Sequence, residues 1–551
     1  MSLLLLSIAS SAAGEADNAT CLHACANGSI NSCSHACPNE LELAKATFED
    51  TLLSTGWGVL NVRGSDPHAM GKLEGCLTRQ HIYDSYLTNM DFTFGCVNMS
   101  CVPKAVRAFM TKQDEWARAQ VSARPHDPFW VALGGLLAQY DGLTQGYHAT
   151  SSSCYQPAPP PLPDFAFQLL NGVGDLFQII PSVIPSKRPD WTRMNQTQTR
   201  RELERSGHCS GLVRVLPGFE DLLMGHSSWF EYPDMNRIFK YYTLEGTGLA
   251  GLKLGAGVSS RTVSFSSYPG YLESLDDFYM MDSGLGMVQT SNGVPNSTLL
   301  DLITPESLLA WQRVRVASLL ANTGEEWYTT FKTAASGTYV NQYMVVDFNR
   351  FTPSKPLQPG TLWVVEEIPG LVEGADQTPT LARGFWPSYN VPFYAEVYRR
   401  SGYADAFDGA APLFDGGGAE YQIGAPRSKL FREHASSVVS MPTFQQFMRY
   451  ANYSDPYAID PKTGAVDYHA AICMRGDLAG GGTGKAGGCY DSKVTSYLHG
   501  ARELKASVVN GPSSSASAVG STNAPFTWRP FDGVHAGLPA VFDFPWRAVA
   551  P

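Results

Sequence analysis

Apolar residues recur at helical spacing in four stretches of the first third of the chain. This spacing predicts helices at Glu40 to Leu53, Pro103 to Ala123, Phe129 to Tyr140 and Phe165 to Ile184. The third stretch is apolar and contains two glycines, which is typical of a buried helix. The segment 155–163 that follows it is proline-rich and predicts a stiff, extended connector.

Beyond residue 208 the pattern changes to short, turn-bounded runs that are rich in β-branched and aromatic residues. Cys209 begins one run, and Asp221 to Trp229 follows after a Pro-Gly turn, so we expect a β-hairpin that starts at a cysteine. A helix is predicted at Pro305 to Ala321. Further strands are predicted at Thr262–Ser267, Phe278–Met281, Met287–Thr290, Tyr343–Phe348 and Leu362–Glu366.

The composition narrows the class of protein. Charged residues make up 17% of the 551 positions, against a usual figure of about 25%, and 44% are hydrophobic, so a disordered chain or a coiled coil is excluded. The formal net charge of −11 argues against a broad nucleic-acid surface, which needs clustered lysine and arginine. No run of 18 apolar residues occurs, so we expect no integral membrane segment.

The N-terminus and the glycosylation sequons point to the secretory pathway. Residues 3–9 are apolar and residues 10–14 are small, which predicts a signal peptide over 1–13 that is cut near Ala12 or Ala13. Six Asn-x-Ser/Thr sequons predict glycosylation at Asn18, Asn27, Asn98, Asn195, Asn296 and Asn452. Lysosomal and extracellular delivery stay equally open.

The eleven cysteines also point to the secretory pathway, and because their number is odd, one must stay unpaired if the others form disulfides. Residues 21–37 hold two Cys-x3-Cys pairs with His23 and His35 between them, a pattern that fits a zinc site or a small disulfide hairpin. An oxidising compartment favours the disulfides. We also expect a Cys473–Cys489 disulfide, because the glycine-rich stretch between the two residues is flexible enough to close.

Residues 186–208 are polar and basic and predict an exposed, cuttable linker in front of Cys209. A cut between His208 and Cys209 would free the α-amine of Cys209 beside its thiol, so this amine could act as the base for an N-terminal nucleophile. Cys209 is also the natural unpaired cysteine. The alternative is a cysteine that is simply buried.

Two other motifs resemble catalytic or phosphate-binding motifs, but the sequence around each of them does not fit. The sequence 207–211 has the G-x-C-x-G form of a nucleophile elbow, but the elbow needs a strand before the nucleophile and a helix after it, which is the reverse of the predicted order. The glycine-rich stretch ending at Lys485 lacks the first glycine and the Ser/Thr of a P-loop, so it predicts a plain loop.

Several motifs after residue 206 resemble the phospholipase B-like family of lysosomal and secreted proteins. The similar stretches are 207–218, 221–229, 265–270, 276–279, 336–347, 366–370, 387–393, 493–496 and 535–546. The resemblance runs from about residue 40 to residue 551 in the family's order. It implies an α+β fold of the N-terminal nucleophile hydrolase type, an αββα sandwich in which two antiparallel sheets lie between helical layers.

The resemblance also implies a division of the precursor into two chains. The expected parts are a signal peptide over 1–13, a cysteine-rich extension over 14–39, an N-terminal part over 40–185, a cleavable linker over 186–208 and a C-terminal part over 209–551. The arginines in the linker suggest further trimming after the first cut.

By resemblance, Cys209 is the nucleophile, and polar residues around it take catalytic roles. His226 would assist proton transfer, and Trp229 on the same strand would line the pocket. Asn341 would donate to the oxyanion, although the family often has Asn where this chain has Val340.

Three further residues follow from the same resemblance. Asn390 is a second oxyanion donor, Arg427 orients a substrate carbonyl or phosphate, and Thr290 is a further pocket residue. The alternative for each of these three is a structural hydrogen bond.

The function implied is removal of fatty acyl chains from glycerophospholipids by an acyl hydrolase that needs no cofactor and no metal. The same apparatus would cut amides, so an N-acyl amide hydrolase is a rival, and a non-catalytic lipid-binding glycoprotein is a second. The expected partners are a phospholipid or other acyl-lipid substrate and the second chain from the same precursor, with a homodimer left open and no nucleic acid.

Overall fold

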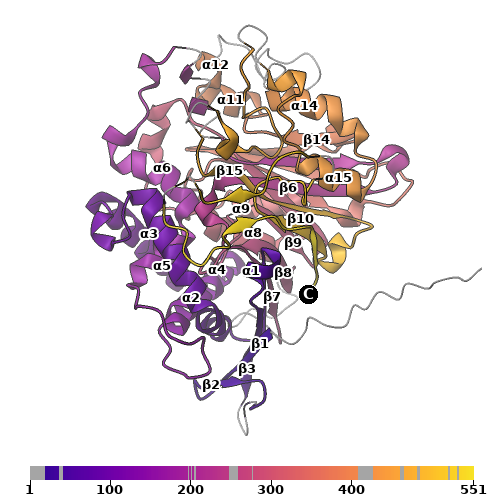
Figure 1. Ribbon diagram of the computed structural model, residues 1–551. Helices are drawn as coiled ribbons and strands as arrows, with labels where there is room; N and C mark the ends of the chain where they lie inside the picture. The colour runs from indigo at the N-terminus through magenta and orange to yellow at the C-terminus, as the bar shows by residue number, and fades with distance from the viewer. Residues whose placement is uncertain are drawn as a thin grey trace, which may run out of the picture.

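The computed structural model of the chain has two β-sheets lying face to face, with helices on both outer sides (Figure 1). The structure describes residues 19–35, 37, 41–195, 198–199, 202–203, 207–246, 259–275, 277–406, 426–459, 464–480, 484–518, 521–529, 531 and 533–551. Within these ranges, no helix has both the length and the apolar character needed to cross a bilayer.

The larger sheet has eleven strands, and every neighbouring pair is antiparallel except β4 and β7, which run parallel. In spatial order the strands are β13 (Leu371–Asp376), β12 (Leu362–Ile368), β11 (Asn341–Asp347), β10 (Leu285–Ser291), β9 (Phe278–Met281), β8 (Thr262–Ser267), β7 (Ile238–Leu244), β4 (Gly58–Gly64), β3 (Glu42–Glu49), β1 (Ala19–Cys25) and β2 (Ile30–Ser32). The central strands are buried on both faces, because another layer covers each side.

The smaller sheet has six strands and contains the predicted hairpin. Its spatial order is β14 (Phe385–Ser388), β5 (Ser210–Val215), β6 (Leu222–Glu231), β15 (Gly487–Ser496), β16 (Ala506–Asn510) and β19 (Arg547–Val549). Strands β5 and β6 form the hairpin, with Ser210 opposite Ser227. A separate pair, β17 (Phe526–Thr527) and β18 (Val541–Phe542), completes the described strands.

The two sheets share one apolar core. Val213 and Met224 of the smaller sheet belong to the same buried cluster as Phe239, Val288 and Met344 of the larger sheet. The sheets approach closely at β5, where a Cβ added to Gly211 would lie 3.0 Å from Met344 Cε. The core holds the start of β5, and with it Cys209, against β10 and β11 of the other sheet.

Helices cover both outer faces. The described helices are α1 (Leu52–Thr55), α2 (Pro67–Phe94), α3 (Lys104–Ala123), α4 (Pro128–Tyr147), α5 (Asp164–Asn171), α6 (Val173–Val183), α8 (Ala310–Leu320), α9 (Gly324–Phe331), α10 (Thr378–Leu381), α11 (Ala395–Ser401), α12 (Tyr403–Ala406), α14 (Pro426–His434) and α15 (Met441–Met448). Helices α2, α4 and α8 pack on the larger sheet, and α14 and α15 pack on the smaller one. The predicted αββα architecture is confirmed.

The helix predictions fare unevenly. Those at Pro103 to Ala123 and Phe129 to Tyr140 are confirmed as α3 and α4, whereas Phe165 to Ile184 forms two helices that meet at Gly172. The prediction at Glu40 to Leu53 is wrong, because burial there alternates with a period of two and the segment forms strand β3.

The longest of the described helices, α2, was not predicted at all. Its buried face carries Glu74, Thr78 and Arg79, so the apolar period that would reveal a helix is interrupted. Glu74 is balanced by Lys240 of β7, whose Nζ lies 2.7 Å from its Oε1.

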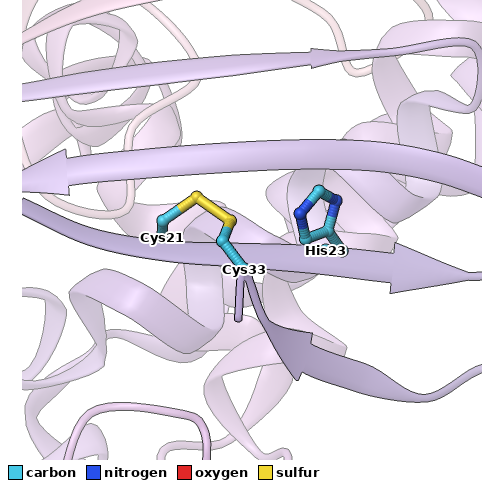
Figure 2. A group of neighbouring side chains, drawn as sticks. All are labelled: Cys21, His23 and Cys33. Carbon is cyan, nitrogen blue, oxygen red and sulfur yellow. A yellow bond between two sulfur atoms is a disulfide. The ribbon is translucent and has the colours of Figure 1, made fainter. Parts of the chain in front are cut away.

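Five disulfides tie the fold together, and two of them lie in the cysteine-rich segment. The pairs are Cys21–Cys33, Cys25–Cys37, Cys76–Cys154, Cys96–Cys101 and Cys473–Cys489. Figure 2 shows the Cys21–Cys33 bond on β1 beside His23, whose Nδ1 lies 2.6 Å from Glu42 Oε2. Because β1 also pairs with β3, this segment extends the larger sheet and does not stand apart from it.

The predicted glycosylation positions differ in accessibility. Four are exposed, namely Asn27, Asn98, Asn195 and Asn452. Asn296 is partly buried, and its Nδ2 donates to the Arg400 carbonyl oxygen at 3.0 Å. Asn18 lies outside the described residues.

Candidate active site

Cys209 stands directly before strand β5 and is a free, buried thiol. The five disulfides use ten of the eleven cysteines and leave this one. Its φ of 80° lies in the left-handed region, which costs a non-glycine residue about 1–2 kcal/mol. Its Sγ accepts a hydrogen bond from the Trp229 N–H at 3.5 Å. The backbone is therefore strained at the predicted cleavage point.

The carbonyl group of His208, which precedes Cys209, accepts two hydrogen bonds. The Ser291 N–H on β10 donates to it at 3.1 Å, and the Asn390 side-chain Nδ2 donates to it as well. Asn390 is held in place because its Oδ1 accepts from Arg427 Nη2. Two donors therefore converge on the His208 carbonyl oxygen, and the Asn390 Nδ2 also donates to the Ser291 carbonyl oxygen.

The residue before His208 has to be small. A Cβ added to Gly207 would lie 2.6 Å from the Asn390 Cβ, so any larger residue would push this donor away.

Arg427 on helix α14 connects several groups of the site. Its Nη1 donates to the Cys209 carbonyl oxygen at 2.7 Å and to Ser210 Oγ at 3.3 Å. Its guanidinium carbon lies 4.2 Å from the centre of the Trp229 ring, a cation–π distance. Arg427 and Trp229 therefore lie beside Cys209.

Asn341 and Thr290 lie near the site, but their polar groups are used elsewhere. Asn341 is opposite Ser291 in the pairing of β10 with β11, and its Nδ2 donates to the Tyr343 hydroxyl at 3.0 Å. Thr290 Oγ1 is 2.6 Å from Ser388 Oγ, which links the two sheets. Asn390, and not Asn341, is the side chain that donates to the His208 carbonyl.

His226 on β6 is fully buried beside a lysine. Lys493 Nζ lies 3.1 Å from the His226 Nδ1, and since an ammonium group can only donate, Nδ1 is the acceptor and Nε2 carries the proton. Burial, together with the charge on Lys493, holds the pKa of His226 well below its usual value. The Nδ1 lone pair of the neutral imidazole already accepts a hydrogen bond from Lys493. His226 is therefore poorly suited to the proton-transfer role expected for it.

A carboxylate that was not among the predicted site residues lies next to Cys209 and His226. One oxygen of Asp277, one ring nitrogen of His226 and the Cys209 Sγ all lie within 4.8 Å of one another. Asp277 Oδ2 accepts from Ser228 Oγ at 2.8 Å and faces Lys493 Nζ at 3.7 Å.

Asp277 belongs to a buried cluster of two acids and two bases. Arg237 Nη2 lies 3.6 Å from Asp277, and Arg237 Nε lies 2.8 Å from Asp491, which also pairs with Lys493 at 2.7 Å. We call Asp277, Asp491, Arg237 and Lys493 the charge cluster. Its two carboxylates and two cations balance each other, as a buried ionic group requires.

The electrostatics of the uncut chain keep the thiol protonated. Burial, with the Asp277 carboxylate nearby, raises the pKa of the Cys209 thiol well above its ordinary value. Burial also raises the pKa of Asp277, while Lys493 and Arg237 counteract that rise. A carboxylate with a raised pKa is a stronger proton acceptor than an exposed one.

Two groups of residues resemble metal sites by their composition. A thiol, an imidazole and a carboxylate are donors that a transition metal accepts, but beside Cys209 the Lys493 ammonium already supplies positive charge to His226 and Asp277. At the N-terminal segment the sulfurs of Cys21 and Cys33 are bonded to each other, so the disulfide interpretation holds there and the zinc interpretation does not (Figure 2).

The sequence contained a signal that could have identified Asp277 and Lys493. Both lie in motifs that carry the family resemblance, at 276–279 and 493–496, but neither was identified as part of the site. The missing information was spatial, since only the pairing of β15 with β6 brings Lys493 opposite His226.

Comparison with known proteins gives consistent matches along the chain. The phospholipase B family model matches residues 44–549. Phospholipase B-like 1 of Rattus norvegicus is 41% identical over 517 residues, which cover 92% of this chain and 87% of that protein. Phospholipase B of Crotalus adamanteus is 37% identical and covers 92% of this chain and 88% of its own length.

Among solved structures, a mutant of the conjugated bile acid hydrolase from Clostridium perfringens aligns with 55% of this chain and 89% of its own. The identity is 12% and the TM-score is 0.31. The family assignment rests on the sequence matches, which extend through both sheets and every residue of the site. The chain belongs to the phospholipase B family.

Proposed function

We propose that this chain is a phospholipase B-like acyl hydrolase that cuts itself between His208 and Cys209 and then uses Cys209 as its N-terminal nucleophile. The observation that carries the proposal is the His208 carbonyl, which accepts hydrogen bonds from Ser291 and Asn390 directly beside a free thiol. Both donors point at a carbonyl directly before a free thiol, which is the arrangement that an oxyanion formed by attack of this thiol needs.

The first step needs a base, because in the uncut chain the nitrogen of Cys209 is an amide. Asp277 is the acid–base group within reach of the thiol. As Sγ attacks the His208 carbonyl carbon, the S–H bond breaks and its proton passes to Asp277. The oxyanion that forms is held by Ser291 N–H and Asn390 Nδ2.

Collapse of this intermediate breaks the bond between the His208 carbonyl carbon and the Cys209 nitrogen. Asp277 returns its proton to the departing amine, and the residue 208 acyl group is left on Sγ as a thioester. Water then hydrolyses the thioester, which frees the carboxylate of His208 and the thiol of Cys209. The chain now carries an α-amine with a pKa of about 7.7–8.0 beside the thiol.

In turnover this amine replaces Asp277 as the base. The Cys209 sulfur attacks the acyl ester carbonyl, the proton passes through the amine to the leaving alcohol, and water releases the fatty acid from the thioester. The names of the relatives in Rattus norvegicus and Crotalus adamanteus favour phospholipid esters. The amide alternative uses the same groups, and the lipid-binding alternative leaves the two carbonyl donors without a purpose.

The test is N-terminal sequencing of the purified protein, followed by measurement of fatty acid released from phosphatidylcholine vesicles. We expect a chain that begins at Cys209, an uncut Cys209→Ala variant, and ester hydrolysis that appears only in cut protein. Cut protein that hydrolyses N-acyl amides and not phospholipids would favour the amide alternative. A chain that stays whole would overturn the proposal and favour the lipid-binding alternative.

We further propose that the linker is trimmed after the cut and that the protein follows the secretory pathway. Arg193 in the linker is 86% exposed, while Arg188 near its start pairs with Asp301 at 2.7 Å. The other linker arginines, Arg200, Arg201 and Arg205, lie outside the described residues. Five disulfides suit an oxidising compartment. Peptide mapping that recovers residues 186–208 intact in mature protein would refute the trimming.

A further inference from the structure

The ring of His208 is enclosed by aromatic side chains on the side of the scissile bond that carries the acyl group. It stacks on Phe177 of helix α6, with ring centres 5.4 Å apart, and meets the edge of Phe230 of β6 at 5.5 Å. Phe177 in turn contacts Phe230 at 5.7 Å and Tyr339 at 6.4 Å. We call Phe177, Phe230 and Tyr339, together with the volume that the His208 ring fills beside them, the aromatic cleft.

The aromatic cleft disfavours charge. Burial lowers the pKa of His208 to about 4, so its imidazole is neutral there. From the cleft, aromatic contacts continue towards the surface, because Phe230 packs at 5.0 Å against Phe92, which is 41% exposed. Ring contacts therefore run from His208 through Phe230 to a phenylalanine at the surface.

The thioester formed in the proposed self-cleavage can be compared with the thioester formed from a lipid substrate. In the self-cleavage thioester, the group bonded to the carbonyl carbon on Sγ is the rest of residue 208. In a lipid-derived thioester, it is the fatty acyl chain. Since both carbonyl oxygens must meet the same donors, Ser291 N–H and Asn390 Nδ2, both substituents must leave the carbonyl carbon in the same direction.

We propose that the aromatic cleft is the subsite for the acyl chain of the substrate, and that the His208 ring fills it until the chain is cut. The inference rests on the proposed function and adds to it the place and the apolar character of acyl binding. It makes His208 an internal stand-in for substrate, so the uncut chain is inactive for two reasons: it lacks the amine, and its acyl subsite is occupied.

The experiment compares two series of p-nitrophenyl and alkyl esters on the cut protein. One series varies the acyl chain from acetyl to dodecanoyl with a fixed leaving group, and the other varies the leaving alcohol with a fixed acetyl group. For Phe177→Ala we expect kcat/KM for the dodecanoyl ester to fall on the order of ten-fold, and kcat/KM for acetyl esters to change less than two-fold.

Phe165→Ala is the matched control, because Phe165 is a half-buried phenylalanine on the neighbouring helix α5 that packs against Arg107. It should leave both series unchanged. Phe177→Leu keeps an apolar side chain and serves if the alanine variant folds poorly; its effect should have the same direction and be smaller.

Three results would overturn the proposal. They are an equal loss on all acyl lengths, a change confined to the leaving-alcohol series, and no change at all in cut protein. If no ester is turned over, alkylation of Cys209 by N-alkyl maleimides replaces the assay. The preference for long over short alkyl chains should then fall in Phe177→Ala, and an unchanged preference would refute the subsite. A chain that stays uncut shows an intact N-terminus, so failure of the proposed function is recognised separately.

Discussion

The bond between His208 and Cys209 lies between two regions of opposite character. On one side is the charge cluster, where two carboxylates and two cations are buried together behind the thiol. On the other side is the aromatic cleft, where a histidine is held neutral between phenylalanines. In the proposed mechanism the first region moves protons and the second holds the acyl chain.

This separation suggests how one site handles two reactions. In the proposed mechanism, the charge cluster is needed most before the cut, when no amine exists, and the aromatic cleft is needed most afterwards, when the His208 ring has left. Asn390 and Ser291 stand between the two regions and serve the carbonyl in both reactions. Variants that affect one reaction more than the other therefore test the division directly.

The largest effect is expected from Asp277→Asn, which keeps the size of the side chain and removes the base. Self-cleavage should slow by about 100-fold or more, because general-base catalysis contributes about 10²–10⁴. The measurement is the appearance of the chain that begins at Cys209, followed over time in freshly refolded protein. Asp347→Asn is the control, since Asp347 is also buried and pairs with Arg350 at 3.0 Å, away from Cys209. Equal cutting rates in the two variants would remove Asp277 from the mechanism.

The same reaction should depend on pH through Asp277. A carboxylate accepts a proton only when ionised, so the cutting rate should rise with pH through the pKa of Asp277 and then level off. Burial places this rise above the ordinary range of an aspartate.

The second effect compares the two asparagines that the sequence analysis treated alike. Asn390→Ala removes a donor to the scissile carbonyl and should slow the cut by about 10²–10³-fold, the usual cost of one oxyanion donor. Asn341→Ala should slow it far less, because its Nδ2 donates to Tyr343. Thermal melting of both variants shows whether the fold is kept. A larger loss for Asn341→Ala would mean that the carbonyl changes partners before it reacts.

These two expectations show what the sequence could and could not supply. Motif resemblance and the order of the linker and the strand located Cys209, and the β5–β6 hairpin followed from apolar runs around a Pro-Gly turn. Asn390 was identified as a donor, but its contact with the His208 carbonyl depends on a tertiary approach between segments 182 positions apart.

The misread segments have local causes. Strand β3 was predicted as a helix because Leu41, Ala44 and Phe48 also follow the three- and four-residue spacing of a helix. Its pairing with β1 and β4 shows that it is a strand. Helix α2 was missed because it buries charged residues against partners on β7 and in loops far along the chain. Sequence pattern reveals burial of apolar groups well, and burial of paired charges hardly at all.

The third effect tests the aromatic cleft in the uncut chain. His208→Phe should be cut within a few-fold of the natural rate, since another neutral ring fits between Phe177 and Phe230. His208→Asp should be cut about 10–100-fold more slowly, because a carboxylate in an aromatic site pays a desolvation cost. Both rates come from the same time course of chain cleavage. Similar rates for the two variants would show that the residue 208 side chain leaves the cleft before the cut.

The last prediction concerns the free energy of unfolding. It compares Asp234, a buried carboxyl group that forms no ion pair within the described part of the chain, with the paired carboxylates of the charge cluster. Asp234 accepts one hydrogen bond from Asn89 at 3.0 Å, its Oδ2 has no partner among the described residues, and burial raises its pKa to about 8. The folded chain thus binds more protons at Asp234 than the unfolded chain between about pH 4 and pH 8, so stability should fall as pH rises through that window.

Asp234→Asn removes this titration and should flatten the pH dependence of the unfolding free energy, by on the order of 3 kcal/mol between pH 5 and pH 7.5, because each pH unit in this window contributes about 1.4 kcal/mol. Chemical denaturation at the two pH values measures it. The control Asp491→Asn should behave differently, because burial opposes its ionisation yet Lys493 and Arg237 hold the pKa of Asp491 below its ordinary value. That variant should lose stability at both pH values, since it leaves two buried cations with one carboxylate. If both variants respond alike to pH, the pairing of charges does not distinguish Asp234 from the charge cluster.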